Sequence, residues 1–353
     1  MAISLDTGPM DGTRRLAVVV DPDNALSELS EGNNRLERVV QVQPDWSRWR
    51  GRKRLRVNAG AVEREDEPIL ASFALPAKAD PSSLRVVETD AKGNPLRSVP
   101  AQLDGSTLCA VLPGKTPAGA ERHLAVLWAE GSGARFLPVG APAWNAATQT
   151  VVMEGYEARF SSGSLTFLAP RHNGVTGANF LASLILSSQA TGWSSEDGKV
   201  ELFQVERAGP VRVTIAVRKA LGAGVTYQKR YDFFPRRFDL EIAVNKPAGG
   251  LYSRAHYLLP GTYLDDKGFT ARVDGKGEAE EVYGKNRDPK WYAVFAPQWA
   301  HSCVALSPFD HIAYWDAGQL GAIGFVADNR TEGIRMSYVI HPGASDGSFA
   351  ARD

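Results

Sequence analysis

Residues 209–245, with the sequence GPVRVTIAVRKALGAGVTYQKRYDFFPRRFDLEIAVN, decide the fold of this protein. Apolar and polar residues alternate from Val211 to Val217, and they alternate again from Asp239 to Val244, after a turn at Pro235–Arg237. Because successive side chains of a strand point to opposite faces, this period of two gives each strand one apolar face. The stretch therefore predicts a three-stranded antiparallel meander with one buried face, whose middle strand spans 225–234.

The rest of the chain carries the same kind of signal, and helical periodicity is nearly absent. Short apolar runs are separated by turn-forming residues, and the 34 glycines and 21 prolines suit a turn-rich β protein. Further strands are predicted in the second half at 251–259, 291–295, 303–306, 321–327 and 334–340. We expect an all-β fold, a large antiparallel β-sandwich, in which residues 210–259 form neighbouring strands whose polar side is a trough for a sugar.

The chain has 353 residues, which is too long for one ordinary domain. Residues 1–44 hold only two predicted strands, so they form a partial hairpin rather than a whole domain. Residues 45–140 hold several short strands and a hairpin turn at 90–94, and they predict a small β-barrel or β-sandwich. Residues 141–353 hold the large sandwich.

The charge balance excludes two classes of partner. The chain has 40 basic and 40 acidic residues and a formal net charge of zero, which argues against nucleic acid or an anionic membrane surface as the main partner. No apolar run is long enough for a membrane helix. A basic run at 48–56 is interpreted as a solvated strand face and linker, with binding of an acidic polymer as the alternative. Cys109 and Cys303 lie in apolar runs and are expected to be buried free thiols.

Two stretches resemble known families. The pattern VVVDPDN, EGNN and VVQV within residues 18–42 resembles the last hairpin of bacterial CARDB-type immunoglobulin-like modules. This resemblance implies that the earlier strands of such a module are missing and that the chain begins inside a longer protein with flanking domains. Residues 1–6 show no signal peptide. We expect an extracellular or cell-surface protein whose true N-terminus lies upstream.

The stretch at 209–245 resembles the central strands of the galactose-mutarotase-like supersandwich, a fold of polysaccharide lyases, several glycoside hydrolases and mutarotases. The segments DEPILASFALP at 66–76 and LAVLWAE at 124–130 are similar to the N-terminal barrel of exo-rhamnogalacturonan-lyase-like (YetA-like) proteins. Together the resemblance covers about residues 52–250 and implies a polysaccharide or oligosaccharide as partner. Those lyases usually carry a large α/α toroid domain, and no helical segment of that kind occurs in this sequence.

Tyr252, Arg254 and His256 form the strongest candidate for a reacting group. In a strand these three side chains point to the same face. β-Elimination of a uronic acid needs a cation for the carboxylate, a base, and an acid for the leaving oxygen, and Arg, His and Tyr supply these roles. The alternative is a solvent-facing amphipathic strand.

His172 and Asn173 lie in a predicted loop bounded by Pro170 and Gly174. They could polarise a sugar carboxylate or bind hydroxyls, and the alternative is an Asx turn with an exposed histidine. Pyranose rings stack on aromatic side chains, and flanking polar groups take the hydroxyls. The candidates for sugar contact are Arg171, Tyr257, Trp291, Trp299, His301 and Trp315. Most of the aromatic residues near the last four should be core, with one or two of the three tryptophans exposed.

No metal site or cofactor is predicted. Asp265 and Asp266 are expected to form a turn, with a Ca²⁺ site as the alternative. The leading hypothesis is a carbohydrate-active enzyme that degrades a polysaccharide by β-elimination or by glycoside hydrolysis. The first alternative is a non-catalytic glycan-binding or spacer module. The second is a sugar epimerase or mutarotase that pairs His256 with a carboxylate of Glu201, Glu206 or Glu241.

Overall fold

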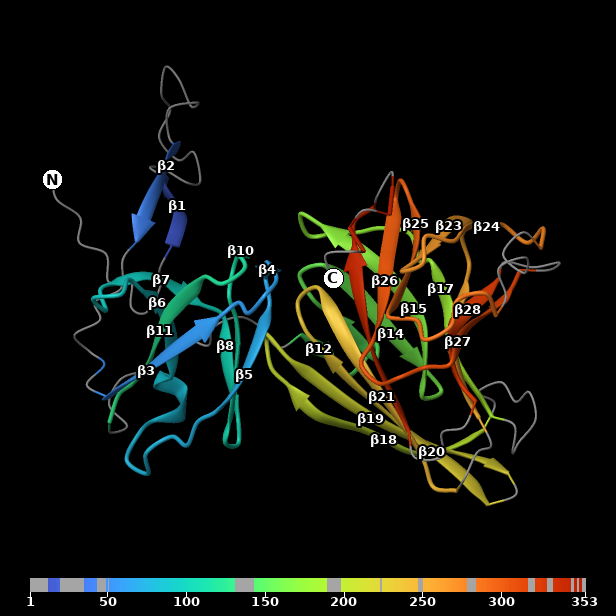
Figure 1. The fold of residues 1–353 in the computed structure, drawn as a ribbon. Helices are drawn as coiled ribbons and strands as arrows, with labels where there is room; N and C mark the ends of the chain where they lie inside the picture. The colour runs from blue at the N-terminus through green and yellow to red at the C-terminus, as the bar shows by residue number, and fades with distance from the viewer. Residues whose placement is uncertain are drawn as a thin grey trace, which may run out of the picture. The chain divides into compact units, whose positions relative to one another are not determined.

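The computed structural model describes most of the chain and divides it into two compact units, Met1–Gly140 and Ala141–Asp353 (Figure 1). The residues that it describes are 12–19, 35–42, 49, 51–130, 143–188, 198–222, 224–246, 250–277, 284–316, 321–328, 333–343, 346–347 and 349–350. Within these ranges the secondary structure is β apart from one short 3-10 helix, η3 (Pro81–Ser83). The all-β prediction is therefore confirmed.

The first unit begins with the two strands that the sequence predicts. β1 (Gly12–Val19) pairs antiparallel with β2 (Arg35–Val42), with Gly12 opposite Val42. The Asp-Asn turn and the Glu and Asn pair on which the immunoglobulin-like resemblance partly rests lie between these strands, outside the described residues.

The remainder of the first unit is a small sandwich built from two main sheets. The sheets are β3 (Gly51–Asn58), β11 (Glu121–Trp128), β6 (Arg85–Thr89) and β7 (Pro95–Val99) in the first, and β5 (Pro68–Ser72), β9 (Thr107–Val111) and β8 (Ala101–Asp104) in the second; a short pair joins β10 (Lys115–Thr116) to β4 (Arg64–Glu65). Both main sheets contribute to one apolar core that includes Val86, Leu108, Ala110 and Val126. The hairpin turn predicted at 90–94 joins β6 to β7.

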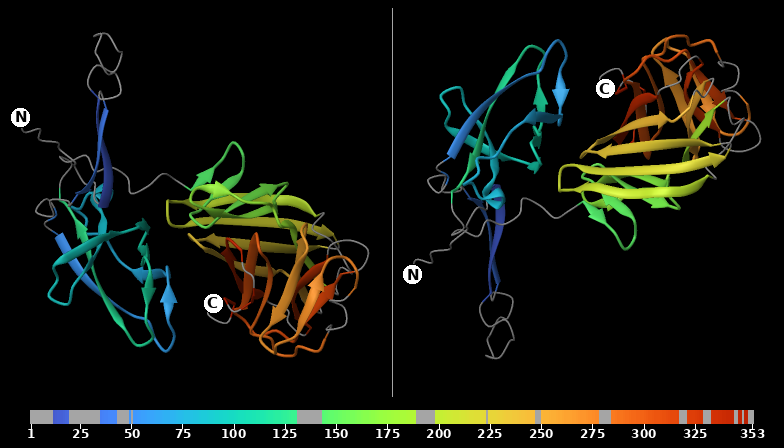
Figure 2. Two further views of the ribbon diagram at one scale, coloured as in Figure 1. Left: turned by 90° about the horizontal axis from the view of Figure 1, so that it is seen from above. Right: turned by 90° about the horizontal axis from the view of Figure 1, so that it is seen from below.

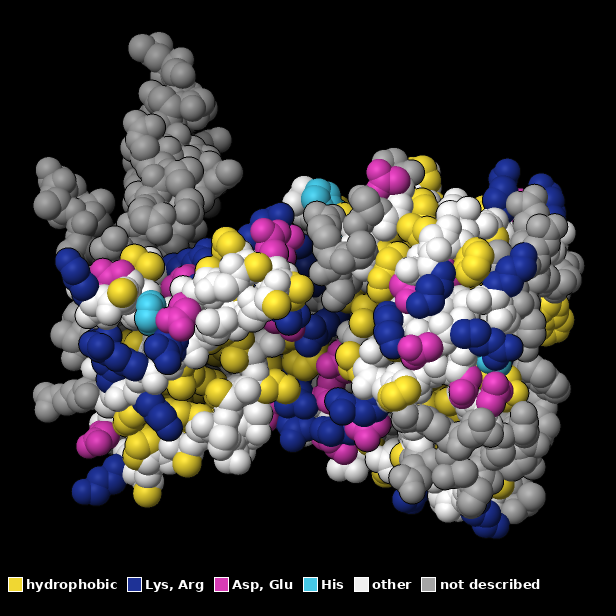
Figure 3. Space-filling view, viewed as in Figure 1, with side chains coloured by type: hydrophobic (Ala, Val, Ile, Leu, Met, Phe, Trp, Pro, Cys, Tyr) yellow, Lys and Arg dark blue, Asp and Glu magenta, His cyan; other side chains and the backbone are white. Residues whose placement is uncertain are grey.

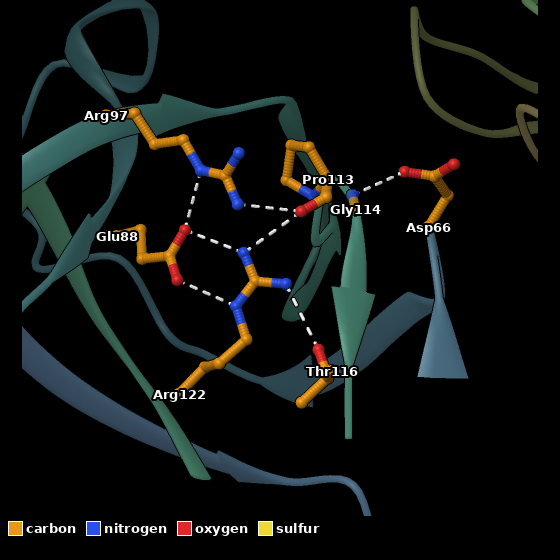
Figure 4. A network of polar contacts seen from close by, with 7 residues as sticks. All are labelled: Asp66, Glu88, Arg97, Pro113, Gly114, Thr116 and Arg122. Carbon is orange, nitrogen blue, oxygen red and sulfur yellow. Dashed lines mark hydrogen bonds and ion pairs between the residues drawn. The ribbon is translucent and has the colours of Figure 1, made fainter. Parts of the chain in front are cut away.

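The carboxylate of Glu88 in β6 links three strands of the first sheet through arginines of β7 and β11 (Figure 4). Glu88 accepts hydrogen bonds from Arg122 Nε at 2.7 Å and Nη2 at 2.6 Å, and from Arg97 Nε at 2.7 Å. Both arginines also donate to the carbonyl oxygen of Pro113. Burial acts to raise the pKa of Glu88, but the hydrogen bonds and charges of Arg122 and Arg97 outweigh it, so the pKa is lowered.

The second unit is a large antiparallel sandwich of three sheets (Figures 1 and 2). The nine-stranded sheet has the order β18 (Lys199–Ala208), β19 (Val213–Gly222), β20 (Val225–Phe233), β21 (Arg237–Val244), β29 (Ile334–His341), β26 (Trp299–Ala305), β25 (Trp291–Ala296), β23 (Gly261–Asp265) and β24 (Thr270–Val273). The four-stranded sheet has the order β17 (Leu181–Ser188), β22 (Leu251–Tyr257), β28 (Ala322–Ala327) and β27 (His311–Trp315). The five-stranded sheet has the order β12 (Trp144–Asn145), β13 (Thr150–Val152), β14 (Tyr156–Ser161), β15 (Ser164–His172) and β16 (Val175–Thr176).

The decisive stretch folds as predicted, because β19, β20 and β21 are consecutive antiparallel neighbours. Their inward side chains, such as Ile215, Tyr231 and Leu240, are at most 1% exposed. One continuous core joins them to inward residues of the two smaller sheets, including Phe160 and Phe325. Cys109 and Cys303 are buried thiols that form no disulfide with each other, as expected.

The position of residues 251–257 differs from the prediction. β22 does not lie beside β21 but belongs to the four-stranded sheet, where it pairs with β17 and β28. The edge of β21 is taken instead by β29, with Arg237 opposite Val339. Alternating residues mark a strand with a buried face but do not mark the sheet that it joins, so the chain order 210–259 suggested the wrong neighbour. The expected trough of adjacent ribbons is not formed by this stretch.

None of the helical segments among the described residues is long and apolar enough to cross a membrane.

We expect Glu88→Gln to lower the free energy of unfolding at neutral pH by about 1–3 kcal/mol, since it removes the charge that two arginines bind. The folded pKa of Glu88 lies below its unfolded value, so its stabilisation is complete above about pH 4.3 and is lost as the pH falls through the folded pKa. Urea denaturation at pH 7 and at pH 3 measures both effects.

The matched control is Glu63→Gln, because Glu63 pairs with Lys115 at 2.9 Å and both side chains are about half exposed. This change should cost no more than about 1 kcal/mol. Equal losses for the two variants would contradict a structural role for the Glu88 network.

Candidate functional site

The outer face of the four-stranded sheet carries the candidate site. Tyr252, Arg254 and His256 alternate along β22 with inward residues that are fully buried, such as Leu251 and Ala255. Their side chains therefore point away from the core, on one common face. Tyr252 and His256 are half-buried, and Arg254 is 6% exposed.

The register of the neighbouring strands fills in this surface, which we call the β22 face. Across β17, β22, β28 and β27 its three rows are Ser187–Tyr252–Val326–His311, Ile185–Arg254–Gly324–Ala313 and Ser183–His256–Ala322–Trp315. Small residues, Ala322 and Gly324 of β28 and Ala313 of β27, lie between the β22 side chains and Trp315, and all three are buried. Gly324 is required there, because a Cβ atom would lie 1.8 Å from the carbonyl oxygen of Ser253.

Trp315 is the exposed aromatic residue of the β22 face, with 55% of its surface accessible. It lies two strands from His256 in the same row, which separates their backbones by about 10 Å. That spacing is comparable with a pyranose ring and its substituents. One exposed tryptophan agrees with the number expected for residues 291–315.

The electrostatics of the β22 face are set by Arg254 and His256. Arg254 Nη2 lies 3.4 Å from Ser187 Oγ, so its guanidinium is held against β17. Burial lowers the pKa of His256 to about 4, and the positive charge of Arg254 adds to this shift. His256 is therefore a neutral imidazole at neutral pH, able to accept a proton, beside a cation able to bind a carboxylate.

His311 and Asp328 are polar residues at the edge of the β22 face that the sequence analysis did not select as site residues. His311 Nδ1 lies 3.3 Å from Asp328 Oδ2. Burial lowers the pKa of His311, and the nearby Asp328 carboxylate opposes that shift. The alternation of His311, Ala313 and Trp315 along one strand is the signal that would have placed His311 on this face.

The predicted loop residues Arg171, His172 and Asn173 lie at the hairpin that joins β15 to β16. Asn173 and Gly174 have φ values of 50° and 81°, as a two-residue hairpin turn requires. His172 is exposed, and Arg171 donates to the carbonyl oxygens of Met153 and Gly174. In the described part of the chain, His172 and Asn173 make no hydrogen bond, ion pair or ring contact with the β22 side chains. A role for them in sugar binding stays a prediction.

Tyr257, Trp299 and His301 are core residues, which corrects their interpretation as sugar contacts. Each is at most 2% exposed. Tyr257 Oη and His301 Nε2 are 2.8 Å apart, and the Trp299 ring stacks on Phe180 with centroids 4.7 Å apart. All three rings are therefore packed inside the sandwich, out of reach of a sugar.

Trp291 is half-buried in β25 and packs against a cluster that includes Phe295 and Phe349. Trp291 and Trp315 therefore do not share a surface, because Trp291 lies in the nine-stranded sheet and Trp315 in the four-stranded one.

The proposed mutarotase pairs are separated by the sandwich. Glu201 and Glu206 form ion pairs with Arg218 and Arg230, whose side chains point outward from the nine-stranded sheet. Glu241 is also exposed on that sheet. Figure 3 shows basic and acidic side chains interleaved in this region. His256 lies on the outer face of the opposite sheet, so these carboxylates cannot assist it.

Asp265 forms a turn. Its carboxylate accepts hydrogen bonds from Tyr263 Oη at 2.6 Å and from the backbone N–H groups of Lys267 and Phe269 at 3.0 Å. Asp266 accepts a hydrogen bond from Asn286 Nδ2 at 2.8 Å. A search of the described residues finds no cluster of three or more His, Cys, Asp or Glu side chains that could hold a metal ion.

No family model matches the chain, and no curated protein matches it. Among solved structures it is similar to an alpha-mannosidase from Enterococcus faecalis V583, at 12% identity and a TM-score of 0.49, over 86% of this chain and 43% of that one. It is also similar to a protein in the glycosyl hydrolase family 38 from Enterococcus faecalis, at 10% identity and a TM-score of 0.47, over 86% of this chain and 44% of that one. The chain spans less than half the length of either, and both likenesses are too distant to assign a function. The resemblance to YetA-like lyases stays a prediction.

We expect the His256 imidazole to titrate near pH 4 in the intact protein, when its ring protons are followed by NMR spectroscopy. Arg254→Met should raise this pKa, because it removes a neighbouring positive charge, but not to the usual value of about 6.5, since burial remains. The control is Arg335→Met, which removes an exposed cation from the nine-stranded sheet. A titration near pH 6.5 in the unmodified chain, or equal shifts in both variants, would contradict this environment.

Proposed function

We propose that this chain is the β-sandwich part of an extracellular carbohydrate-active protein that acts on a polysaccharide, and that the β22 face contacts the sugar. The observation that carries the proposal is the arrangement on one sheet face of an exposed tryptophan, a neutral histidine and a buried arginine. An aromatic platform binds the apolar face of a sugar ring, and the arginine supplies a charge for an acidic substituent.

β-Elimination is the reaction that suits these side chains best. Arg254 would bind the uronate carboxylate and so favour loss of the adjacent C5 proton. His256 would accept that proton with its unprotonated nitrogen, and Tyr252 would donate a proton to the O4 atom as the C4–O4 bond breaks. The C5 electron pair becomes the new C4–C5 double bond, so the step needs no other reactant.

Glycoside hydrolysis would instead need two carboxyl groups on opposite sides of the scissile bond. Asp328 lies at the edge of the β22 face through its contact with His311, and Asp310 accepts a hydrogen bond from the Asp328 backbone. These two residues are the carboxylates that a hydrolytic mechanism at this face would use.

A non-catalytic glycan-binding module is the second candidate. The observation that favours it is the burial of Arg254, which leaves Trp315, Tyr252 and His256 as the accessible groups of the face. An aromatic platform with few polar partners binds a sugar without needing to transfer a proton.

A panel of neutral and uronate-containing polysaccharides, read both by ultraviolet absorbance of unsaturated products and by reducing ends, tests these functions together. For a lyase, His256→Gln should lower the initial rate by about 100-fold or more, because the base is lost. The control is Leu306→Ala, which trims an exposed apolar side chain away from the β22 face and should leave the rate unchanged. Reducing ends without unsaturated products would indicate hydrolysis and would exclude elimination.

Trp315→Ala should weaken polysaccharide binding by about tenfold in affinity electrophoresis, because it removes the platform on which a sugar ring stacks. Leu306→Ala is again the control. Binding that is unchanged by Trp315→Ala would move the sugar site away from the β22 face, and binding without any product would favour the non-catalytic module.

A further inference from the structure

The first unit has a pocket of its own, separate from the β22 face. It has a volume of about 130 Å³ and is lined by Arg54, Leu55, Arg56, Thr89, Asp90, Ala91, Gly93, His123 and Leu124. These residues come from three neighbouring strands, β3, β11 and β6, and from the hairpin turn that follows β6.

Strand alternation explains why basic side chains gather there. Arg52, Arg54 and Arg56 occupy every second position of β3 and share one face, while the intervening Lys53 points to the other side, where its Nζ lies 5.6 Å from the centre of the Phe73 ring. Arg56 lies opposite His123 of β11. Figure 3 shows Lys and Arg side chains gathered on the surface of this unit.

The hairpin turn closes one side of the pocket. Arg52 Nη2 donates to the carbonyl oxygen of Gly93 at 2.7 Å. A Cβ atom at position 93 would lie 2.8 Å from Arg52 Nη2 and 2.9 Å from Arg54 Nη2. The glycine, which also has a φ of 92°, therefore allows two guanidinium groups to pack against the turn.

The positive charge of the pocket is only partly balanced. Asp90 uses one carboxylate oxygen for Asn94 N and the other for Asn94 Nδ2, at 2.8 and 2.7 Å. Arg56 Nε is 3.7 Å from Glu121 Oε1, and both side chains are well exposed, so this pair is weak. Arg54 makes no hydrogen bond or ion pair with any residue in the described part of the chain. Lys92, exposed in the turn, adds a further cation.

We propose that this pocket binds the anionic group, carboxylate or sulfate, of an acidic saccharide. A guanidinium presents paired N–H donors that match the two oxygens of such a group. The volume suits one sugar unit rather than a length of polymer, and the Asp90 carboxylate gives sugar hydroxyls an acceptor beside the arginines. The described residues that line the pocket include no Phe, Tyr or Trp, the large rings on which the bases of single-stranded nucleic acid stack best.

The test uses the full chain and isothermal titration calorimetry at low salt. The probes are polygalacturonate, its fully methyl-esterified form, dextran sulfate, dextran and a single-stranded RNA homopolymer. We expect polygalacturonate or dextran sulfate to bind, and the stronger of the two identifies the anionic group. The methyl ester and dextran should bind at least tenfold more weakly, because they lack the charge.

Arg54→Ala should weaken binding of the acidic glycan by about tenfold, and Arg54→Ala with Arg56→Ala should weaken it further. Lys78→Ala is the matched control, since it removes an exposed cation from the same unit outside the pocket and should change the affinity less than twofold. Urea denaturation checks that the arginine variants remain folded. Their side chains are exposed, so the midpoint should not shift.

Equal losses in Arg54→Ala and Lys78→Ala, equal binding of the methyl ester, or tighter binding of RNA than of either acidic glycan would each overturn the proposal. Binding that depends on Arg54, without product from any polysaccharide, would support anion binding in the pocket and count against catalysis at the β22 face. The two proposals can therefore fail independently of each other.

Discussion

The pairing of β29 with both β21 and β26 is the interaction on which the large sandwich depends. β18 to β21 are joined by local turns, and β23 to β26 form a second local group. β29 lies between these groups, with Leu240 opposite Met336 on one side and Cys303 opposite Tyr338 on the other. β29, near the end of the chain, therefore joins two groups of strands into a single nine-stranded sheet, which we call the wall. Its pairing with β21 brings together residues about 100 positions apart in the sequence, so a long loop must close for it to form.

This wall determines where a functional surface can lie. Its inward side chains need partners across the core, and β22 supplies several of them, including Leu251 and Tyr257. Because β22 buries one set of alternate residues, it must present the other set outward. Tyr252, Arg254 and His256 are thus held by the core packing of their neighbours, and the glycine at position 324 allows β28 to approach β22 closely beneath them.

The sequence predicts strands better than it predicts their partners. The alternation from Val211 to Val244 correctly indicates β19, β20 and β21, because each of these strands has one buried and one wetted face. It could not show that β22 crosses to the other layer, since alternation records burial and not pairing. The interior position of β26 could not be predicted for a different reason. Residues 299–303 are buried on both faces of the strand, so apolar and polar residues do not alternate there. The sequence pattern therefore did not indicate that Trp299 and His301 are interior.

The same limit applies to the basic run of the first unit. Its composition allows a solvated face or an acidic partner, and only the register with β11 shows that Arg54 and Arg56 meet a histidine and a turn. The spacing of Tyr252, Arg254 and His256 was sufficient to place them on one face. Their burial was not predictable, because it depends on neighbours far away in the sequence.

The difference in burial between the two arginine groups has a consequence for ionic strength. Arg254 is enclosed by protein, where mobile ions cannot approach it closely, whereas Arg54 and Arg56 stand in solvent. Rising salt should therefore weaken the attraction of anions to the first unit well before it alters the field at β22. In a saline habitat the charge of Arg254 would therefore act on His256 almost undiminished, while the pull of Arg54 and Arg56 on anions in solution would fall.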